Sequence, residues 1–380
     1  MVDIPEHIKN LKAYVPGKPI DELAREKNLE RVVKLASNEN PLGPSPKAIE
    51  ALANALRASH RYVDPSSHNL VRAIAKKYDK KPEQIICGHG IDAILAYIIN
   101  AFTNESDEIL TSEGTFIGIY VNAMKFGRKV VRIPQKEFGF DLKAVADAIT
   151  ENTKLIYLAN PNNPTGTMFN RSQFETFMSK VPESIPVILD EAYTAFAEEH
   201  DGYPDGFNFD FKNLIVTRTF SKAYGLAGLR VGFAVANPEL IKVLYKVKLP
   251  FEPNLAAQAA AIAALDDDEF LTRTKEMNSV SLNLFRNFFD ELGIKQVPTT
   301  TNFILLLFPT DDFASAFNEE CQNNGLIVRY VKPFGISNGI RINSGTEDET
   351  DFAINVIRKV YAQLKMRFDK ATPEEKIVRS

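Results

Sequence analysis

The sequence has few cysteines, and the two that it has, Cys87 and Cys321, lie in opposite halves of the chain. A disulfide framework or a zinc site needs several cysteines at short spacings. The five histidines are equally scattered and lack the spacing of metal ligands. We therefore expect neither structural disulfides nor a bound metal.

Long apolar runs and dense basic segments are also missing. The most apolar run, residues 91–102, contains Asp92 and Asn100 and is shorter than the roughly 20 residues that cross a bilayer. A net charge of −4 without a Lys/Arg block argues against nucleic acid or anionic membrane as a partner. The first residues are charged and lack the apolar core of a signal peptide. These absences predict a soluble, cytoplasmic protein that acts on small molecules.

What is present indicates a folded α/β protein. The 380 residues exceed the usual size of one core, and 44% of them are apolar, so we expect two folded domains. The proline-rich residues 1–45 predict an extended arm with one short helix at residues 20–26. We expect a large domain over residues 46–268, a small α+β domain over 269–370, and a charged tail over 371–380.

Alternating helical and apolar segments give the expected elements of both domains. In the large domain we expect helices at residues 46–57 and 69–77 and strands at 84–87, 108–111, 129–133, 155–159, 187–189, 214–217 and 231–236. Several of these strands are continuously apolar, which favours a mostly parallel sheet with helices on both faces. In the small domain we expect helices at 270–292, 313–323 and 348–366 and strands at 302–308, 327–329 and 340–343.

A lysine in a short polar segment is the strongest functional signal. Thr219, Ser221 and Lys222 follow the apolar run 214–217, and Arg230 comes soon after them. A lysine amine can form a Schiff base with an aldehyde cofactor, while hydroxyls and a guanidinium hold the phosphate of that cofactor. Taken alone, this segment would rather predict an ordinary surface lysine, because lysines are mostly exposed. The hypothesis of pyridoxal phosphate therefore needs partners for the other groups of the cofactor.

Candidates for those partners stand at the ends of two predicted strands. Asp190 follows the apolar run 187–189, where a carboxylate can pair with a pyridinium nitrogen or cap a helix. Tyr193 could donate a hydrogen bond to the phenolic oxygen of the ring. Asn163 lies in the proline-rich turn 160–166 and could present its amide to the same oxygen.

The glycine-rich residues 88–93 allow two interpretations. Exposed N–H groups near Ile91 and Asp92 at a helix start make an anion site. The same letters match the G-x-G-x-x-A fingerprint, so a nicotinamide-dependent oxidoreductase is the alternative. The alternative leaves the lysine and the strand-end carboxylate without a role, and we favour a phosphate site.

Three further residues are candidates for ring and substrate contacts. Phe116 follows the strand 108–111 and could stack on a cofactor ring or belong to the core. Arg341 lies within an apolar strand, and Arg329 has a similar setting. A buried arginine needs an anionic partner, which could be a substrate carboxylate, a substrate phosphate or a structural salt bridge.

With these residues in place, the chain resembles the fold-type I pyridoxal phosphate aminotransferases of class I/II, most closely those that act on histidinol phosphate. The resemblance rests on the segments at residues 14–19, 37–41, 160–166, 219–230 and 340–342. It implies that Lys222, Asp190 and Tyr193 are catalytic. It also implies that the cofactor is held by Lys222, Ile91, Asp92, Phe116, Asn163, Asp190, Tyr193, Thr219, Ser221, Arg230 and Tyr62.

The resemblance also implies substrates and a partner subunit. Arg341, Arg329 and Tyr14 match substrate-binding positions. Tyr62 matches a tyrosine that reaches the site of the other subunit in a homodimer, and the arm would pack on the small domain and on that subunit. The implied reaction moves an amino group between histidinol phosphate, or an aromatic amino acid, and 2-oxoglutarate through a ping-pong mechanism and a Lys222 aldimine. An aromatic amino acid aminotransferase and a pyridoxal phosphate lyase or decarboxylase remain alternatives.

Overall fold

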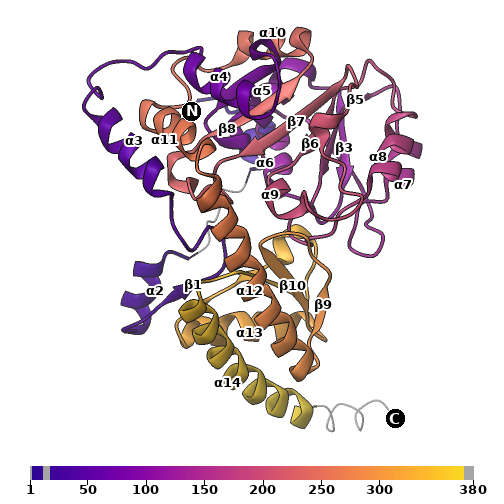
Figure 1. Cartoon of the computed structure of the whole chain (residues 1–380). Coiled ribbons are helices and arrows are strands. Elements are labelled where there is room, and N and C mark those ends of the chain that lie inside the picture. The colour runs from indigo at the N-terminus through magenta and orange to yellow at the C-terminus, as the bar shows by residue number, and fades with distance from the viewer. Residues whose placement is uncertain (1, 12–17, 372–380) are drawn as a thin grey trace.

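Continuous apolar runs form the centre of the fold, because strands that are covered on both faces need no polar alternation. The computed structural model describes residues 2–11 and 18–371 and is shown in Figure 1. Its largest sheet runs in the order β2 (Ile85–Gly88), β8 (Gly232–Ala236), β7 (Leu214–Thr219), β6 (Val187–Asp190), β5 (Thr153–Ala159), β3 (Glu108–Ser112) and β4 (Lys129–Ile133). Only β8 runs antiparallel to its neighbours. The predicted mostly parallel sheet is thus confirmed.

Helices cover both faces of this sheet. One face packs on α5 (Gly90–Phe102), α6 (Ile117–Lys125) and α10 (Pro238–Val247). The other face packs on α3 (Pro46–Leu56), α4 (His68–Lys77), α7 (Leu142–Asp147), α8 (Arg171–Met178) and α11 (Leu255–Leu265). The short α9 (Thr194–Ala197) follows β6. Two apolar layers therefore enclose the sheet and leave its edges for polar groups.

A smaller antiparallel sheet forms the second body of the fold. Its order is β12 (Arg329–Tyr330), β13 (Gly339–Asn343), β10 (Phe303–Leu307) and β9 (Lys295–Val297). It packs against α12 (Asp268–Leu292), α13 (Asp311–Asn323) and α14 (Glu347–Ala371) through a separate apolar cluster. The long α12 runs from the larger body down to the smaller one (Figure 1).

The N-terminal arm is more structured than its prolines predict. Besides α2 (Ile20–Lys27), it contains the short α1 (Glu6–Lys9) and the strand β1 (Val33–Lys34). β1 pairs in parallel with β11 (Leu326–Ile327), which joins the arm to the smaller body. The expectation of one strand at residues 327–329 is wrong, because Ile327 pairs with the arm while Arg329 pairs with β13.

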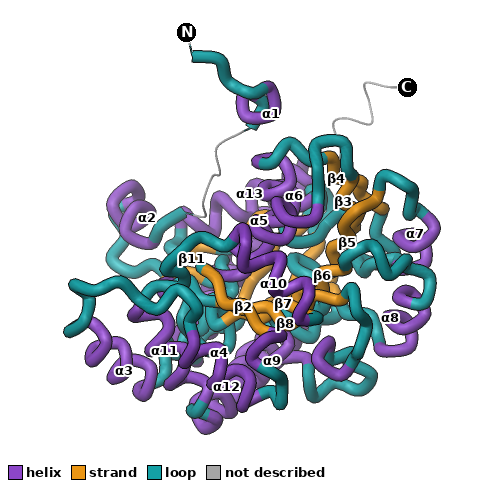
Figure 2. The backbone as a smooth tube through the Cα atoms, turned by 90° about the horizontal axis from the view of Figure 1, so that it is seen from above, coloured by secondary structure: helices purple, strands orange, loops and turns teal. Residues whose placement is uncertain are grey.

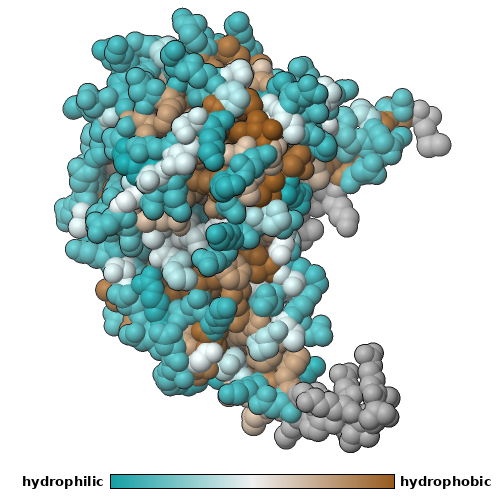
Figure 3. Space-filling model, turned by 90° about the vertical axis from the view of Figure 1, so that its right-hand side faces the viewer, coloured by the Kyte–Doolittle hydropathy of each residue, from teal (hydrophilic) through white to brown (hydrophobic). Residues whose placement is uncertain are grey.

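The periphery of the molecule is largely polar. α1 lies at the edge of the molecule in Figure 2, with His7 beside Gly127 at the end of α6. The face in Figure 3 is mostly hydrophilic, with hydrophobic residues gathered along its middle. Within residues 2–11 and 18–371, no helix has the length and apolarity needed to cross a membrane.

Candidate active site

The ends of three central strands meet at one edge of the large sheet. Asn163 follows β5, Asp190 ends β6 and Thr219 ends β7. Because β5, β6 and β7 are parallel, their carboxyl ends lie together, and in open α/β sheets this edge is where ligands bind. A cavity of about 850 Å³ opens there, and residues of the arm and of the smaller body also line it.

The structure brings most of the predicted site residues to this cavity. Its lining includes Ile91, Asp92, Phe116, Asn163, Asp190, Tyr193, Thr219, Ser221, Lys222, Arg230, Arg329 and Arg341. Tyr62 does not line it: its side chain is 85% exposed and its ring stacks on Phe251 with 4.5 Å between the ring centroids. Tyr14 lies outside the described residues.

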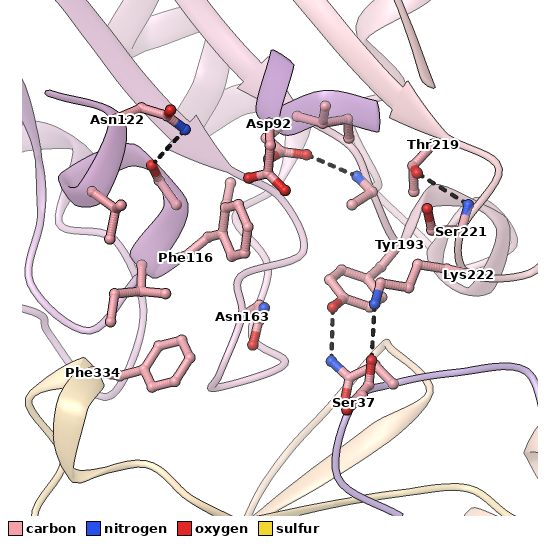
Figure 4. Close-up of a pocket in the computed structure, with 18 of the residues that line it drawn as sticks. Ser37, Asp92, Phe116, Asn122, Asn163, Tyr193, Thr219, Ser221, Lys222 and Phe334 are labelled. Atoms are coloured by element: carbon pink, nitrogen blue, oxygen red, sulfur yellow. Dashed lines mark hydrogen bonds between the residues drawn. The ribbon is translucent and has the colours of Figure 1, made fainter. Parts of the chain in front are cut away.

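Lys222 is held at the cavity by the arm. Its Nζ donates a hydrogen bond to the backbone oxygen of Ser37 over 3.0 Å, and Figure 4 shows the lysine and Tyr193 side by side above this segment. Burial lowers the pKa of Lys222 to about 8, with the nearby Arg341 and Arg230 acting in the same direction. A lysine with a lowered pKa is a better nucleophile and base near neutral pH, because more of its amine is unprotonated.

Asp190 is a buried carboxylate, and its hydrogen-bond partners in the described part of the chain are uncharged. Its Oδ2 accepts a hydrogen bond from the Tyr157 hydroxyl over 2.7 Å, and its Oδ1 accepts one from the Ala192 N–H over 3.1 Å. Burial raises the pKa of Asp190 to about 6, although the Tyr157 bond opposes that rise. Among the described residues no cation pairs with it. A buried carboxylate without a paired cation favours a cationic ligand.

Tyr193 and Arg341 face the cavity from opposite bodies of the fold. The Tyr193 hydroxyl accepts a hydrogen bond from Asn38 Nδ2 over 2.7 Å, and burial raises the pKa of this phenol to about 12. Arg341 donates to Asn163 Oδ1 and, over 2.7 Å, to the backbone oxygen of Ala36. Both of these acceptors are neutral oxygens, and the guanidinium lines the cavity together with Arg329.

A cluster of donors lies at the N-terminus of α5. Arg230 Nη1 donates to Ser221 Oγ over 3.3 Å, and the Ser221 N–H donates to Thr219 Oγ1 over 3.0 Å. Gly90 begins α5 with a φ of +75°, and a Cβ there would come within 2.7 Å of the Arg230 guanidinium. Glycine thus lets the guanidinium approach the free N–H groups of the helix, which together form an anion cradle.

The dinucleotide alternative does not fit the topology. β2 precedes the glycine-rich turn, but it lies at the edge of the sheet and pairs only with the antiparallel β8. A dinucleotide fold needs a parallel β-α-β unit at this turn. The two glycines have other roles: Gly90 admits the Arg230 guanidinium, and Gly88 leaves room for Ile94 and Tyr97.

The sequence pattern missed several residues of the cavity. They include Leu11, Ala36, Ser37, Asn38, Ile117, Val121, Asn122, Lys125, Tyr157 and Phe334. Figure 4 shows Phe334 and Asn122 on the side of the cavity away from Lys222. One signal was available: the Tyr157 hydroxyl is a polar group in the predicted apolar strand 155–159 and needs a buried partner.

Comparison with known proteins agrees with this geometry. The family model described as aminotransferase class I and II matches residues 30–357. Histidinol-phosphate aminotransferase 2 of Hydrogenovibrio crunogenus is 43% identical over 94% of this chain and 96% of that protein. Histidinol-phosphate aminotransferase of Moorella thermoacetica is 41% identical over 94% of this chain and 92% of that protein.

A solved structure extends the comparison to the fold. It is that of histidinol-phosphate aminotransferase from Sinorhizobium meliloti in complex with pyridoxal-5'-phosphate, with a TM-score of 0.89 and 28% identity. The match covers 96% of this chain and 99% of that one. By the extent of the family match and the identity to these relatives, the chain belongs to the class I and II aminotransferases.

Proposed function

We propose that this aminotransferase uses pyridoxal phosphate to move an amino group between histidinol phosphate and 2-oxoglutarate in a ping-pong reaction. The observation that carries the proposal is the pair formed by Lys222 and Asp190 at one cavity, an amine with a lowered pKa and a buried carboxylate without a cation. Relatives named histidinol-phosphate aminotransferase, at 43% and 41% identity, support the substrate.

The residues at the cavity fit the polar groups of pyridoxal phosphate. The cradle of Arg230, Ser221 and the α5 N-terminus suits a phosphate. Asp190 suits a protonated ring nitrogen, and the Tyr193 hydroxyl suits the phenolic oxygen. Lys222 is the amine for the aldehyde. Phe116 lines the same cavity and suits stacking on the ring.

The chain's own groups would then divide the work of proton transfer. When bound, pyridoxal phosphate supplies an electron sink that stabilises negative charge at the substrate Cα. Asp190 keeps the ring nitrogen protonated, which strengthens that sink. The Lys222 amine takes the proton from Cα as a general base and returns one as a general acid. Tyr193 fixes the orientation of the ring by its hydrogen bond, with Asn38 holding the phenol in place.

The charge of the remaining lining favours a doubly charged substrate. Arg329, Arg341 and Lys125 line the cavity in addition to the cradle. Histidinol phosphate brings a phosphate and 2-oxoglutarate brings two carboxylates, so both suit several cations. Apolar lining by Ile117 and Phe334 favours, as the second candidate, an aromatic amino acid.

We also propose that the enzyme acts as a homodimer. Tyr62 is 85% exposed, and its ring stacks on the 40% exposed Phe251. An exposed aromatic pair of this kind is typical of an interface. Tyr62 would then reach the phosphate in the site of the partner subunit.

The test of the function is a panel of half-reactions. The purified protein, saturated with pyridoxal phosphate, should absorb visible light, and an amino donor should bleach that absorption. We expect bleaching to be fastest with histidinol phosphate and glutamate, and slower with phenylalanine and tyrosine. Lys222→Ala should turn over at a rate lower by several orders of magnitude, since positioned proton transfer alone contributes about 10²- to 10⁴-fold. A wild-type protein that binds no pyridoxal phosphate would refute the proposal.

A further inference from the structure

Tyr157 has a buried hydroxyl to which the proposed reaction gives no role. It lies in β5, two residues before Ala159, which is the register partner of Asp190 in β6. Side chains two residues apart on a strand point to the same face, and diagonal neighbours on adjacent strands lie within reach of an aromatic side chain. The sheet register therefore sets the Tyr157 ring beside the Asp190 carboxylate.

Apart from Asp190, the Tyr157 ring packs mainly on apolar side chains, and Tyr120 and Asp92 are the other ionisable groups that act on it. Its side chain is 0% exposed and packs in a cluster with Ile188 and Ile215 of the neighbouring strands. Burying a hydroxyl is costly unless it is hydrogen-bonded, and a phenylalanine would fill the same volume without that cost. Among the described residues, this hydroxyl makes one hydrogen bond, the 2.7 Å bond that it donates to Asp190 Oδ2. The hydroxyl therefore has no packing purpose that a phenyl ring would not serve.

We propose that Tyr157 is a positioning residue that holds Asp190 in the orientation and the ionised form that the ring nitrogen of pyridoxal phosphate requires. The proposal rests on the proposed function. Tyr157 binds one carboxylate oxygen of Asp190 and the Ala192 N–H binds the other, so rotation of the carboxylate is restrained from both sides. An ionised carboxylate has about four acceptor positions, so these donors leave acceptor capacity for the ligand.

The ionisation of Asp190 depends on few groups. Burial and the charge of Asp92 on α5 raise its pKa, whereas hydrogen bonding by Tyr157, by the Ala192 N–H and, to a smaller extent, by the Thr217 hydroxyl lowers it. Two further titratable groups line the same cavity: Tyr193, whose pKa is raised to about 12 and which stays neutral at physiological pH, and Lys222, whose pKa is lowered to about 8. Removing the Tyr157 hydroxyl takes away one of the hydrogen bonds that lower the pKa of Asp190. Burial and Asp92 then raise this pKa further above its present value of about 6.

The test compares cofactor binding by cofactor-free wild-type protein and Tyr157→Phe across pH 5.5 to 8.5. At pH 7 we expect the Kd for pyridoxal phosphate to rise about tenfold, which corresponds to about 1.4 kcal/mol. As the pH is lowered, binding of pyridoxal phosphate should begin to weaken at a higher pH in the variant than in the wild type, because the pKa of Asp190 is higher in the variant. The matched control is Tyr120→Phe, which removes a buried hydroxyl that donates to the Ser112 backbone oxygen instead. Its Kd and pH profile should equal those of the wild type.

A double-mutant cycle separates a positioning role from a structural one. In the Asp190→Asn background, Tyr157→Phe should change the Kd by less than about twofold, because there is no carboxylate left to keep ionised. The inference is overturned if Tyr157→Phe leaves the Kd and the pH profile of the wild type unchanged, or if its effect is equally large in the Asp190→Asn background. A wild-type protein without affinity for pyridoxal phosphate would instead overturn the proposed function.

Discussion

Lys222 and Asp190 are both held in a state that burial opposes. Burial lowers the pKa of the lysine to about 8 and raises that of the aspartate to about 6, so each charge destabilises the folded protein. Functional groups of this kind commonly reduce stability, because the environment that activates them disfavours their charged form. The cost of activation should therefore be measurable without any substrate.

Replacing Lys222 by methionine should stabilise the cofactor-free protein at pH 7. The pKa of Lys222 is about 8 in the folded protein against an ordinary value of 10.5, so the unfolded chain binds more protons between these pH values. The free energy of unfolding therefore rises with pH across that window, and the full cost of the buried ammonium is present below about 8. We expect Lys222→Met to gain about 0.5–2 kcal/mol at pH 7, measured by urea unfolding.

The gain from Lys222→Met should vanish above pH 10.5, where the wild-type amine is neutral in both states. Lys76→Met is the control, since Lys76 is exposed on α4 and has no hydrogen bond among the described residues. Its effect should stay within about 0.5 kcal/mol at every pH. A Lys222→Met variant that is less stable than wild type at pH 7 would contradict the argument.

Removing one partner of the buried ion pair of Arg218 and Glu191 should lower the free energy of unfolding. Arg218 donates to Glu191 Oε2 over 2.7 Å and to Asp205 over 2.6 Å, and the side chains of Arg218 and Glu191 are 5% and 0% exposed. Arg218→Met leaves the Glu191 charge buried without its partner and should lower the free energy of unfolding by about 3–5 kcal/mol. The exposed pair of Arg171 and Glu175 is the comparison, and Arg171→Met should cost at most about 1 kcal/mol. If urea unfolding shows equal losses of stability for Arg218→Met and Arg171→Met, the buried pair contributes no more than the exposed one.

The sequence identified reactive residues better than it identified their supports. Lys222 and Asp190 stand out because a lysine and a carboxylate follow apolar strands. The support of Asp190 by Tyr157 depends on the pairing of β5 with β6, and the support of Tyr193 by Asn38 joins the arm to the large domain. Neither contact has a fixed spacing along the chain, so neither could be predicted from a motif.

At the scale of elements, α2 depends on one buried side chain. Leu23 is 0% exposed and packs with Ala36 and Ile327, whereas Ile20 on the same helix is 44% exposed. We expect Leu23→Ala to lower the free energy of unfolding by about 2–5 kcal/mol and to open the arm to proteases. Ile20→Ala is the matched control and should change little. Equal protection of both variants against limited proteolysis would show that Leu23 does not anchor the helix.

Element positions followed from local patterns, and their errors came from long-range pairing. The strand at Lys129–Ile133 was predicted with its observed bounds, because its β-branched residues lie between Gly127 and Pro134, which mark the two ends. The arm strand β1 was missed because two residues carry no periodicity, and only its pairing with β11 defines it. The same pairing splits the predicted strand 327–329, since Val328 is the point where the chain leaves one sheet for another.

At the scale of the whole molecule, the proposed dimer makes each active site a product of two chains. Tyr62 lies outside the cavity of its own chain and carries an exposed ring stacked on Phe251. If this ring serves the partner subunit, Lys222 and Tyr62 of one chain belong to different sites. Two variants that are each defective should then complement one another.

Mixing Lys222→Ala with Tyr62→Ala, by joint refolding or coexpression, should restore activity. About half of the dimers are mixed, and each mixed dimer has one site with neither change, so about a quarter of the wild-type sites return. The matched control mixes Lys222→Ala with Asp190→Asn: both residues line the cavity of one chain, and mixing should restore nothing. Sedimentation must show dimers in both mixtures. If the first mixture then gains no activity over the sum of its separate components, Tyr62 does not act across the interface.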